Sequence, residues 1–136
     1  MDEARIVSVI VRHHPDVQAI YLFGSYGTEY ERPESDIDIG LLLPHASARA
    51  AGNPALKACW SALVNLLDRP VDLINLRLVN TVFQQQVVQT GRRIFNADPT
   101  ASDTFEMLTL SYYQKLQEER ASIVAEILES KRILSV

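Results

Sequence analysis

Two short segments carry the strongest structural signal in this chain: LFGS at residues 22–25 and, after ten intervening residues, DID at residues 36–38. The apolar run that leads into the first segment, residues 17–23, predicts a short buried strand from its length and its β-branched and aromatic content. At its end, the bare backbone of Gly24 and the hydroxyl group of Ser25 would allow a phosphate group to approach closely. The first segment therefore predicts a strand that ends in a phosphate-binding turn.

The second segment opens an apolar run from Asp36 to Leu43, which predicts a central strand covered on both faces. Because side chains alternate along a strand, Asp36 and Asp38 would point to the same face, with their Cα atoms roughly 6.5–7 Å apart. Two aligned carboxylates repel each other and are unfavourable beside an apolar core. A divalent cation removes both penalties, and Mg²⁺ prefers one or two carboxylates together with substrate phosphates. We therefore expect a magnesium site beside the phosphate-binding turn.

This order of strand, Gly-Ser, ten residues and Asp-x-Asp resembles the signature of the DNA polymerase β-like nucleotidyltransferase superfamily. Within it, the short chain resembles the minimal nucleotidyltransferases, which are often the antitoxin partners of HEPN-domain toxins. The resemblance covers roughly Val17 to Asn96. A bare Gly-Ser or a bare Asp-x-Asp would be a weak signal, so the signature is specific only through its strand context. The alternative to it is a surface loop followed by a strand with a solvated, acidic start.

A third carboxylate lies in the run Val71–Asn75, which predicts another strand. A buried Asp72 without a partner would be costly, so it is expected either to face a partner or to lie near water at a strand end. Asp72 matches the third carboxylate of the superfamily, which lies on a neighbouring strand and faces the first two. The resemblance therefore implies three converging carboxylates.

The resemblance also implies the chemistry and the roles of these residues. The carboxylates of Asp36, Asp38 and Asp72 would be catalytic and would hold two Mg²⁺ ions, and Gly24 and Ser25 would bind the nucleotide. The implied reaction transfers AMP from ATP to a tyrosine hydroxyl group of a cognate HEPN ribonuclease toxin. This AMPylation neutralises the toxin, which is both protein substrate and partner in a hetero-oligomer.

The implied fold is α/β, in the α+β sense: a small mixed sheet flanked by helices, in one domain over residues 1–136, with a long C-terminal helix. Two other functions remain open. A non-catalytic antitoxin would act by binding alone, although a pure binder has no need of three converging acids. A nucleotidyltransferase acting on a small molecule usually needs a second substrate-binding domain, which 136 residues hardly allow.

The composition limits the classes of binding partner and the cellular compartment that we expect for this protein. A formal net charge of −4, from 13 basic and 17 acidic residues, argues against direct nucleic-acid binding, which depends on clustered Lys and Arg. The only cysteine, Cys59, allows no disulfide framework and fits a reducing cytoplasm. The N-terminus lacks the pattern of a signal peptide, and no run approaches the eighteen or so apolar residues of a membrane span. We therefore expect a cytoplasmic protein without a membrane segment.

The remaining elements follow from periodicity and capping residues. Asp98-Pro99 opens a helix expected over residues 99–134, about 50 Å long, whose apolar stripe extends past the part that the body can cover. That stripe indicates a partner surface, or a helix that folds back on its own body. Other helices are expected at residues 2–12, 54–67 and 80–89, the last capped by Asn80, and an edge strand at residues 92–96.

The connector between the two segments departs from the superfamily pattern. Members often have a short helix after the serine, and residues 28–30 would be part of it. Many also carry small and basic residues directly after the serine, whereas Tyr26 and Gly27 occupy these positions here. Arg32 is the only basic side chain between Ser25 and Asp36, and it would either steady a triphosphate or offset the neighbouring glutamates. Arg92 and Arg93, in the edge strand, would either approach phosphates or protect the edge from pairing.

Overall fold

The computed structural model describes residues 2–25, 28–32, 34–50 and 53–134. Its elements follow the order α1 (Asp2–His13), β1 (Ala19–Phe23), β2 (Ile37–Leu42), α2 (His45–Ala50), α3 (Asn53–Leu67), β3 (Val71–Asn75), α4 (Thr81–Thr90), β4 (Arg92–Asn96) and α5 (Pro99–Leu134). These elements confirm the predicted α/β class and lie close to the predicted bounds. The sequence analysis missed the short α2, because its six residues carry no apolar periodicity.

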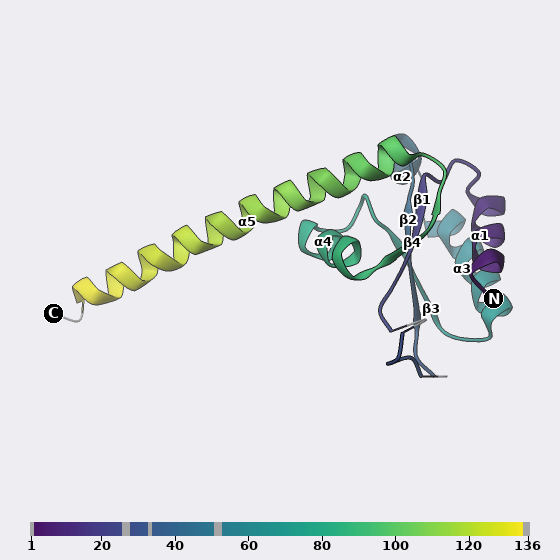
Figure 1. The fold of residues 1–136 in the computed structure, drawn as a ribbon, viewed down its shortest axis with the longest axis horizontal. Helices are drawn as coiled ribbons and strands as arrows, with labels where there is room; N and C mark the ends of the chain where they lie inside the picture. The colour runs from purple at the N-terminus through teal and green to yellow at the C-terminus, as the bar shows by residue number, and fades with distance from the viewer. Residues whose placement is uncertain (1, 26–27, 33, 51–52, 135–136) are drawn as a thin grey trace.

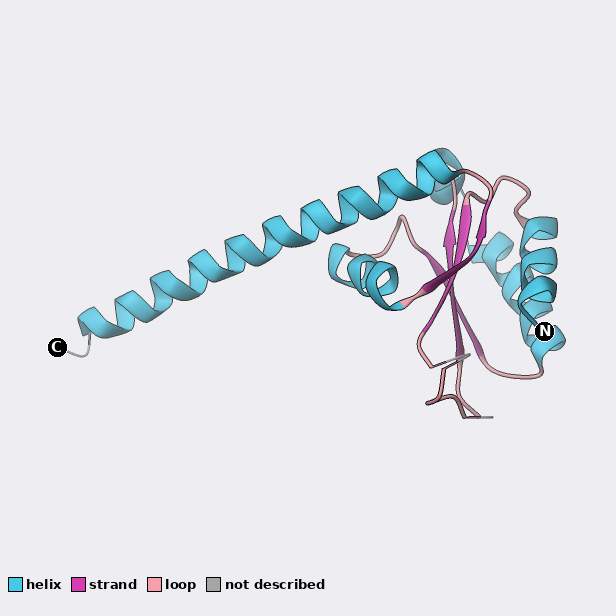
Figure 2. Cartoon of the chain, in the orientation of Figure 1, coloured by secondary structure: helices cyan, strands magenta, loops and turns pink. Residues whose placement is uncertain are grey.

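Four strands form one mixed sheet in the order β3-β2-β1-β4 (Figure 2). β1 pairs in antiparallel fashion with β2 and with β4, whereas β2 and β3 run parallel. β2 is buried along its length apart from the partly exposed Asp38, as expected for a central strand. β4 lies at the edge, where charged side chains discourage further pairing.

Helices cover both faces of the sheet (Figure 1). α1 and α3 pack together on one face, over a core that includes Ile6, Ile10, Ile20, Leu22, Ile37, Ile39, Leu41 and Leu63. α4 and the first turns of α5 cover the other face, over a smaller core formed by Ala19, Tyr21, Leu42, Leu76, Val87 and Phe105. The alternation of side chains along β1 and β2 divides their residues between these two cores.

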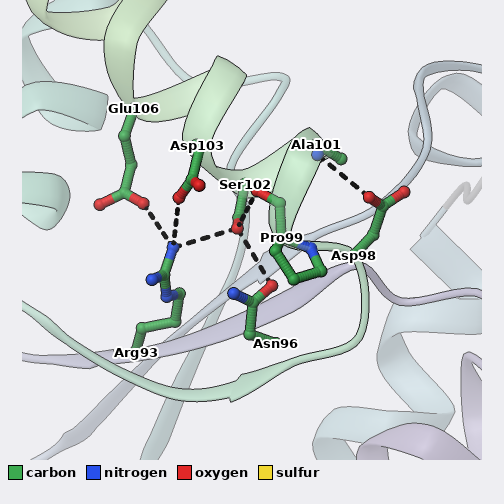
Figure 3. A network of polar contacts seen from close by, with 8 residues as sticks. All are labelled: Arg93, Asn96, Asp98, Pro99, Ala101, Ser102, Asp103 and Glu106. Atoms are coloured by element: carbon green, nitrogen blue, oxygen red, sulfur yellow. Dashed lines mark hydrogen bonds and ion pairs between the residues drawn. The ribbon is translucent and has the colours of Figure 1, made fainter.

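A polar network fixes the start of α5 to the edge strand β4 (Figure 3). The guanidinium group of Arg93 donates to three side chains of α5: Ser102 (3.0 Å), Asp103 (3.3 Å) and Glu106 (2.7 Å). The Ser102 hydroxyl group donates in turn to the side-chain oxygen of Asn96 at 3.0 Å. Arg93 therefore connects an edge strand to a helix, and the network sets the direction in which α5 leaves the sheet.

α5 extends far beyond the rest of the molecule (Figure 1). It contains 36 residues, which at 1.5 Å per residue gives a length of about 54 Å. Leu116 is partly buried, and every side chain from 117 to 131 is exposed. The alternative in which α5 folds back on its own body is therefore wrong. Despite its length, neither α5 nor any other described helix is apolar enough to cross a bilayer.

His14 directly follows α1, and it is only 7% exposed although its side chain is polar. Its Nε2 atom has no hydrogen-bond partner among the described residues. Burial lowers the pKa of His14 below the ordinary value of 6.5, against the opposing charge of Asp16. The folded protein therefore resists protonating this ring.

The unfolded chain protonates His14 at a higher pH than the folded protein does, so stability should fall as pH drops from 6.5 through the lowered pKa of His14. We expect His14→Gln to reduce this acid sensitivity more than His13→Gln does, because the charge of His13 is the smallest of the causes that shift the pKa of His14. Thermal unfolding of the three proteins at about pH 7.5 and about pH 5.5 measures the difference. Equal acid sensitivity in wild type and His14→Gln would contradict the prediction.

Candidate active site

Strand register brings two of the predicted carboxylates together. Asp38 lies opposite Phe23 in the antiparallel pair β1–β2 and opposite Asp72 in the parallel pair β2–β3. Directly opposed residues point to the same face of a sheet, and Phe23 belongs to the core on the α4 side. Asp36 lies two residues before Asp38, near enough for its charge to raise the pKa of Asp38. The carboxylates therefore gather where β1 ends and where β2 and β3 begin.

Gly24 follows β1 and makes room for the central carboxylate. Its φ angle is +73°, in the left-handed region that favours glycine. A Cβ atom at this position would lie 2.1 Å from Oδ2 of Asp38. The Ser25 carbonyl then accepts hydrogen bonds from the backbone N–H of Thr28 at 3.0 Å and from its hydroxyl group at 2.6 Å. Only a residue without a side chain therefore allows the turn to pass so close to Asp38.

Asp38 is the electrostatic centre of the site. Burial raises its pKa above the ordinary value of 3.8, and the negative charges of Asp72 and Asp36 raise it further. Asp36 and Asp72 themselves are exposed. The structure thus combines the two possibilities left open for Asp72, which lies opposite another carboxylate and is also open to water. A bound cation would relieve the repulsion that Asp38 experiences.

The carboxylates suit a metal ion that arrives with its substrate. Among the described residues, no three His, Cys, Asp or Glu side chains are grouped closely enough to hold a metal ion by themselves. Mg²⁺ commonly uses one or two carboxylates and completes its shell with water and substrate phosphates. Gly24 lies directly beside Asp38 and has no side chain that would exclude phosphate groups. The donor set and the glycine turn therefore fit a magnesium–nucleotide complex.

A cavity of about 430 Å³ opens beside these carboxylates, with Phe23, Gly24, Asp38, Asp72, Phe83, Gln86, Val87 and Thr90 along its walls. Its volume lies within the usual range of small-molecule sites. The rings of Phe23 and Phe83 meet edge to face with their centroids 5.8 Å apart. The sequence analysis missed the contribution of α4 to this cavity.

Arg69 is a second residue that sequence reasoning missed. It lies in the turn between α3 and β3, and its guanidinium group donates to the Ser35 carbonyl at 2.9 and 3.3 Å and to the Arg32 carbonyl at 2.8 Å. It also pairs with the Glu31 carboxylate at 2.7 Å. The backbone N–H of Ile37 donates to the Pro70 carbonyl at 2.9 Å in the same region. The turn that precedes Asp72 is thereby tied to the connector that precedes Asp36.

The other basic residues considered in the sequence analysis do not line the cavity. The Arg32 side chain is exposed, and Arg92 pairs with Glu3 at 2.6 Å. Tyr26 and Gly27 lie outside the described residues, and residues 28–30 form a turn in place of the short helix common in the superfamily. Among the described residues, the arginine that binds the connector through its side chain is Arg69.

Asp38→Asn should raise the melting temperature by a few degrees at about pH 7 in the absence of divalent cations. For an acid whose pKa is raised by folding, stability is lost as pH rises from 3.8 through the raised pKa. Asparagine removes this loss and keeps the shape of the side chain. Thermal unfolding in EDTA checks the prediction, with Glu34→Gln as a control for the change in net charge. A lower melting temperature for Asp38→Asn would contradict the proposed repulsion.

Arg69→Ala should destabilise the fold by about 1–2 kcal/mol, because several partly buried hydrogen bonds are lost together. Arg69→Lys should recover only part of this loss, since one ammonium group cannot reproduce the planar fork. Arg92→Ala, which removes one exposed ion pair, should change stability by less than about 0.5 kcal/mol. Urea unfolding ranks the three variants, and equal stabilities of Arg69→Ala and Arg92→Ala would show that the connector contacts contribute nothing.

Known proteins match the chain over most of its length. The family model described as polymerase beta, nucleotidyltransferase matches residues 6–100, a segment that contains all four strands and the three carboxylates. The protein adenylyltransferase MntA of Shewanella oneidensis is 35% identical over 128 residues, which cover 94% of this chain and 88% of that protein. Both matches include the turn at Gly24 and the carboxylates, because they span the whole sheet.

Solved structures agree with these matches. A chain in the crystal structure of a toxin–antitoxin with AMP-PNP is 34% identical, with a TM-score of 0.79, and the match covers 94% of this chain and 99% of that one. A chain in the structure of the tri-AMPylated Shewanella oneidensis HEPN toxin in complex with MNT antitoxin is 35% identical, with a TM-score of 0.74 and coverage of 93% and 96%. The fold, the glycine turn and the aligned carboxylates, together with these similarities, show that the chain belongs to the polymerase β nucleotidyltransferase family.

Proposed function

We propose that this protein is a catalytic antitoxin, which transfers AMP from ATP to a tyrosine hydroxyl group of a HEPN ribonuclease toxin. The observation that carries the proposal is the row formed by Gly24, Asp38 and Asp72 at one end of the sheet. The similar protein MntA is a protein adenylyltransferase. Related complexes hold AMP-PNP in one case and a tri-AMPylated HEPN toxin in another, which supports ATP as donor and a HEPN toxin as acceptor.

The transfer is a displacement at the α-phosphorus of ATP. The tyrosine oxygen forms the new bond to this phosphorus, the bond to the bridging oxygen breaks, and pyrophosphate leaves. The tyrosine proton has to be accepted by a base, because a free tyrosine has a pKa near 10 and is protonated at neutral pH. Asp72 is exposed on the outer strand β3, where an incoming hydroxyl group could reach its carboxylate. We therefore propose that the Asp72 carboxylate accepts the proton of the tyrosine hydroxyl group.

The remaining residues bind and orient the nucleotide. Gly24 lets phosphate oxygens approach the backbone, and the Ser25 hydroxyl group donates a hydrogen bond to them. Asp36, Asp38 and Asp72 would hold two Mg²⁺ ions. When bound, these ions lower the pKa of the acceptor hydroxyl group and neutralise the triphosphate and the leaving pyrophosphate.

The projecting part of α5 is the docking surface for the toxin in this proposal. Four apolar side chains, each 51–56% exposed, lie there at helical spacing: Ile123, Val124, Ile127 and Leu128. An amphipathic helix binds a partner through residues at such i, i+4 positions. The adenylyltransferase and its toxin would therefore form a hetero-oligomer. ATP as the donor and the buried free thiol of Cys59 support a cytoplasmic location.

A non-catalytic antitoxin remains the second candidate, since the exposed stripe of α5 by itself would serve binding. The electrostatics of Asp38 favour the enzyme. Burial and two neighbouring negative charges disfavour its ionised form, and a protein that only binds gains nothing from this arrangement. Transfer to a small molecule would leave the projecting part of α5 without a role.

Two variants separate docking from chemistry. Ile123→Asp combined with Ile127→Asp should weaken toxin binding by at least about tenfold while ATP binding persists. Asp72→Asn should keep the complex but slow AMP transfer by about 100- to 10,000-fold, the range of a lost general base. Pull-down, calorimetry with ATP and Mg²⁺, and the intact mass of the toxin measure these three properties.

Cell survival decides between the two candidate functions. A catalytic antitoxin loses its protective effect in Asp72→Asn at native expression levels, although the complex still forms. Protection by Asp72→Asn with no added mass on the toxin would show that binding is sufficient. Lys131→Ala, on the same exposed helix, serves as a control that should retain both binding and transfer.

A further inference from the structure

α4 presents three consecutive glutamines, and they have different surroundings. The side-chain amide of Gln84 donates to the Leu76 carbonyl at 2.7 Å. Gln85 donates to the side chain of Gln89 at 2.7 Å, on the helix surface. Gln86 lines the cavity beside the carboxylates, and its side chain makes no hydrogen bond within the described residues. Of the three, Gln86 therefore has an amide available for a ligand.

The cavity around Gln86 suits a flat aromatic group that is joined to phosphates. Gly24, Asp38 and Asp72 form its polar wall, while Phe23, Phe83 and Val87 form its apolar wall. A nucleotide bound with its phosphates at the polar wall would direct its base along the apolar wall, because one cavity of about 430 Å³ contains both. Aromatic side chains contribute favourably to contacts with nucleobases.

A carboxamide can distinguish between purines. It offers one donor and one acceptor side by side, which match the N7 acceptor and the N6 amino donor of adenine. Guanine presents acceptors at both N7 and O6, so the amide oxygen would face another acceptor. An amide that is free of other hydrogen bonds can thus select ATP over GTP.

We infer that Gln86 is a specificity-determining residue, which recognises the N6 edge of the donor adenine through its side-chain amide. The inference rests on the proposed function, since it assumes that the carboxylates bind the triphosphate of the donor. It adds the basis for the choice of nucleobase, which the carboxylates and the glycine turn do not supply because they contact phosphate groups.

The first test compares nucleotides in Gln86→Ala and in the matched variant Gln85→Ala. The ratio of kcat/KM for ATP to that for GTP should fall by about 5- to 150-fold in Gln86→Ala, the range expected for one bidentate amide–adenine pair. The ratio should stay at the wild-type value in Gln85→Ala, whose amide bonds to Gln89 on the surface. An unchanged ratio in Gln86→Ala, or an equal loss for both nucleotides, would overturn the assignment.

The second test removes the N6 amino group of the nucleotide, which is the group that the Gln86 amide would contact. Purine riboside triphosphate lacks the N6 amino group, so the wild type should bind it more weakly than ATP, whereas Gln86→Ala should bind the two equally. Calorimetry with Mg²⁺ and non-hydrolysable analogues measures this without any transfer reaction. If the wild type binds nucleotides but modifies no toxin, the proposed function fails and the specificity of Gln86 is still measured. If the wild type modifies the toxin and shows no preference for the N6 group, the inference about Gln86 alone fails.

Discussion

Asp38 lies opposite Phe23 on one side and opposite Asp72 on the other, and this register holds a carboxylate where burial and neighbouring negative charges disfavour its ionised form. The residues beside it in β2, Ile37 and Ile39, are completely buried and pack into the core under α1 and α3. Shifting β2 by one residue would turn these isoleucines out of the core and Asp38 into it. The apolar core therefore stabilises the position of a charged residue in the proposed active site. A bound metal–nucleotide complex would relieve the remaining repulsion.

The two faces of the sheet contribute differently to the structure. The face under α1 and α3 carries the larger core and keeps the strands in register. The face under α4 carries a smaller core, and its end opens into the cavity beside the carboxylates. Arg69 adds a connection along the end of the sheet, since it ties the α3–β3 turn to the connector that precedes Asp36. The cavity therefore lies between α4 and the ends of three strands, and Arg69 holds the connector at the same end of the sheet.

α5 begins at the opposite end of β1 from the glycine turn, because Ala19 pairs with Asn96 whereas Gly24 directly follows Phe23. From there it runs past α4 and away from the sheet (Figure 1). A toxin bound along its exposed part would lie at a distance from the carboxylates and would have to extend a tyrosine-bearing segment back to them. Arg93 contributes to this geometry, since its contacts with Ser102, Asp103 and Glu106 set the direction of α5.

The sequence by itself predicted the types of all the elements except the short α2, and it indicated the carboxylates and the Gly-Ser turn as candidate site residues, because periodicity, capping residues and the Gly-Ser and Asp-x-Asp spacing are local properties of the chain. It predicted β3 and β4 at their observed bounds, and it placed β4 at an edge. Only the tertiary structure decided which strand lies beside which, and therefore that Asp72 faces Asp38 while remaining open to water. Arg69 and Gln86 became visible in the same way, since their roles depend on contacts between segments far apart in the chain. Such contacts arise from strand pairing and helix packing, and no local pattern records them.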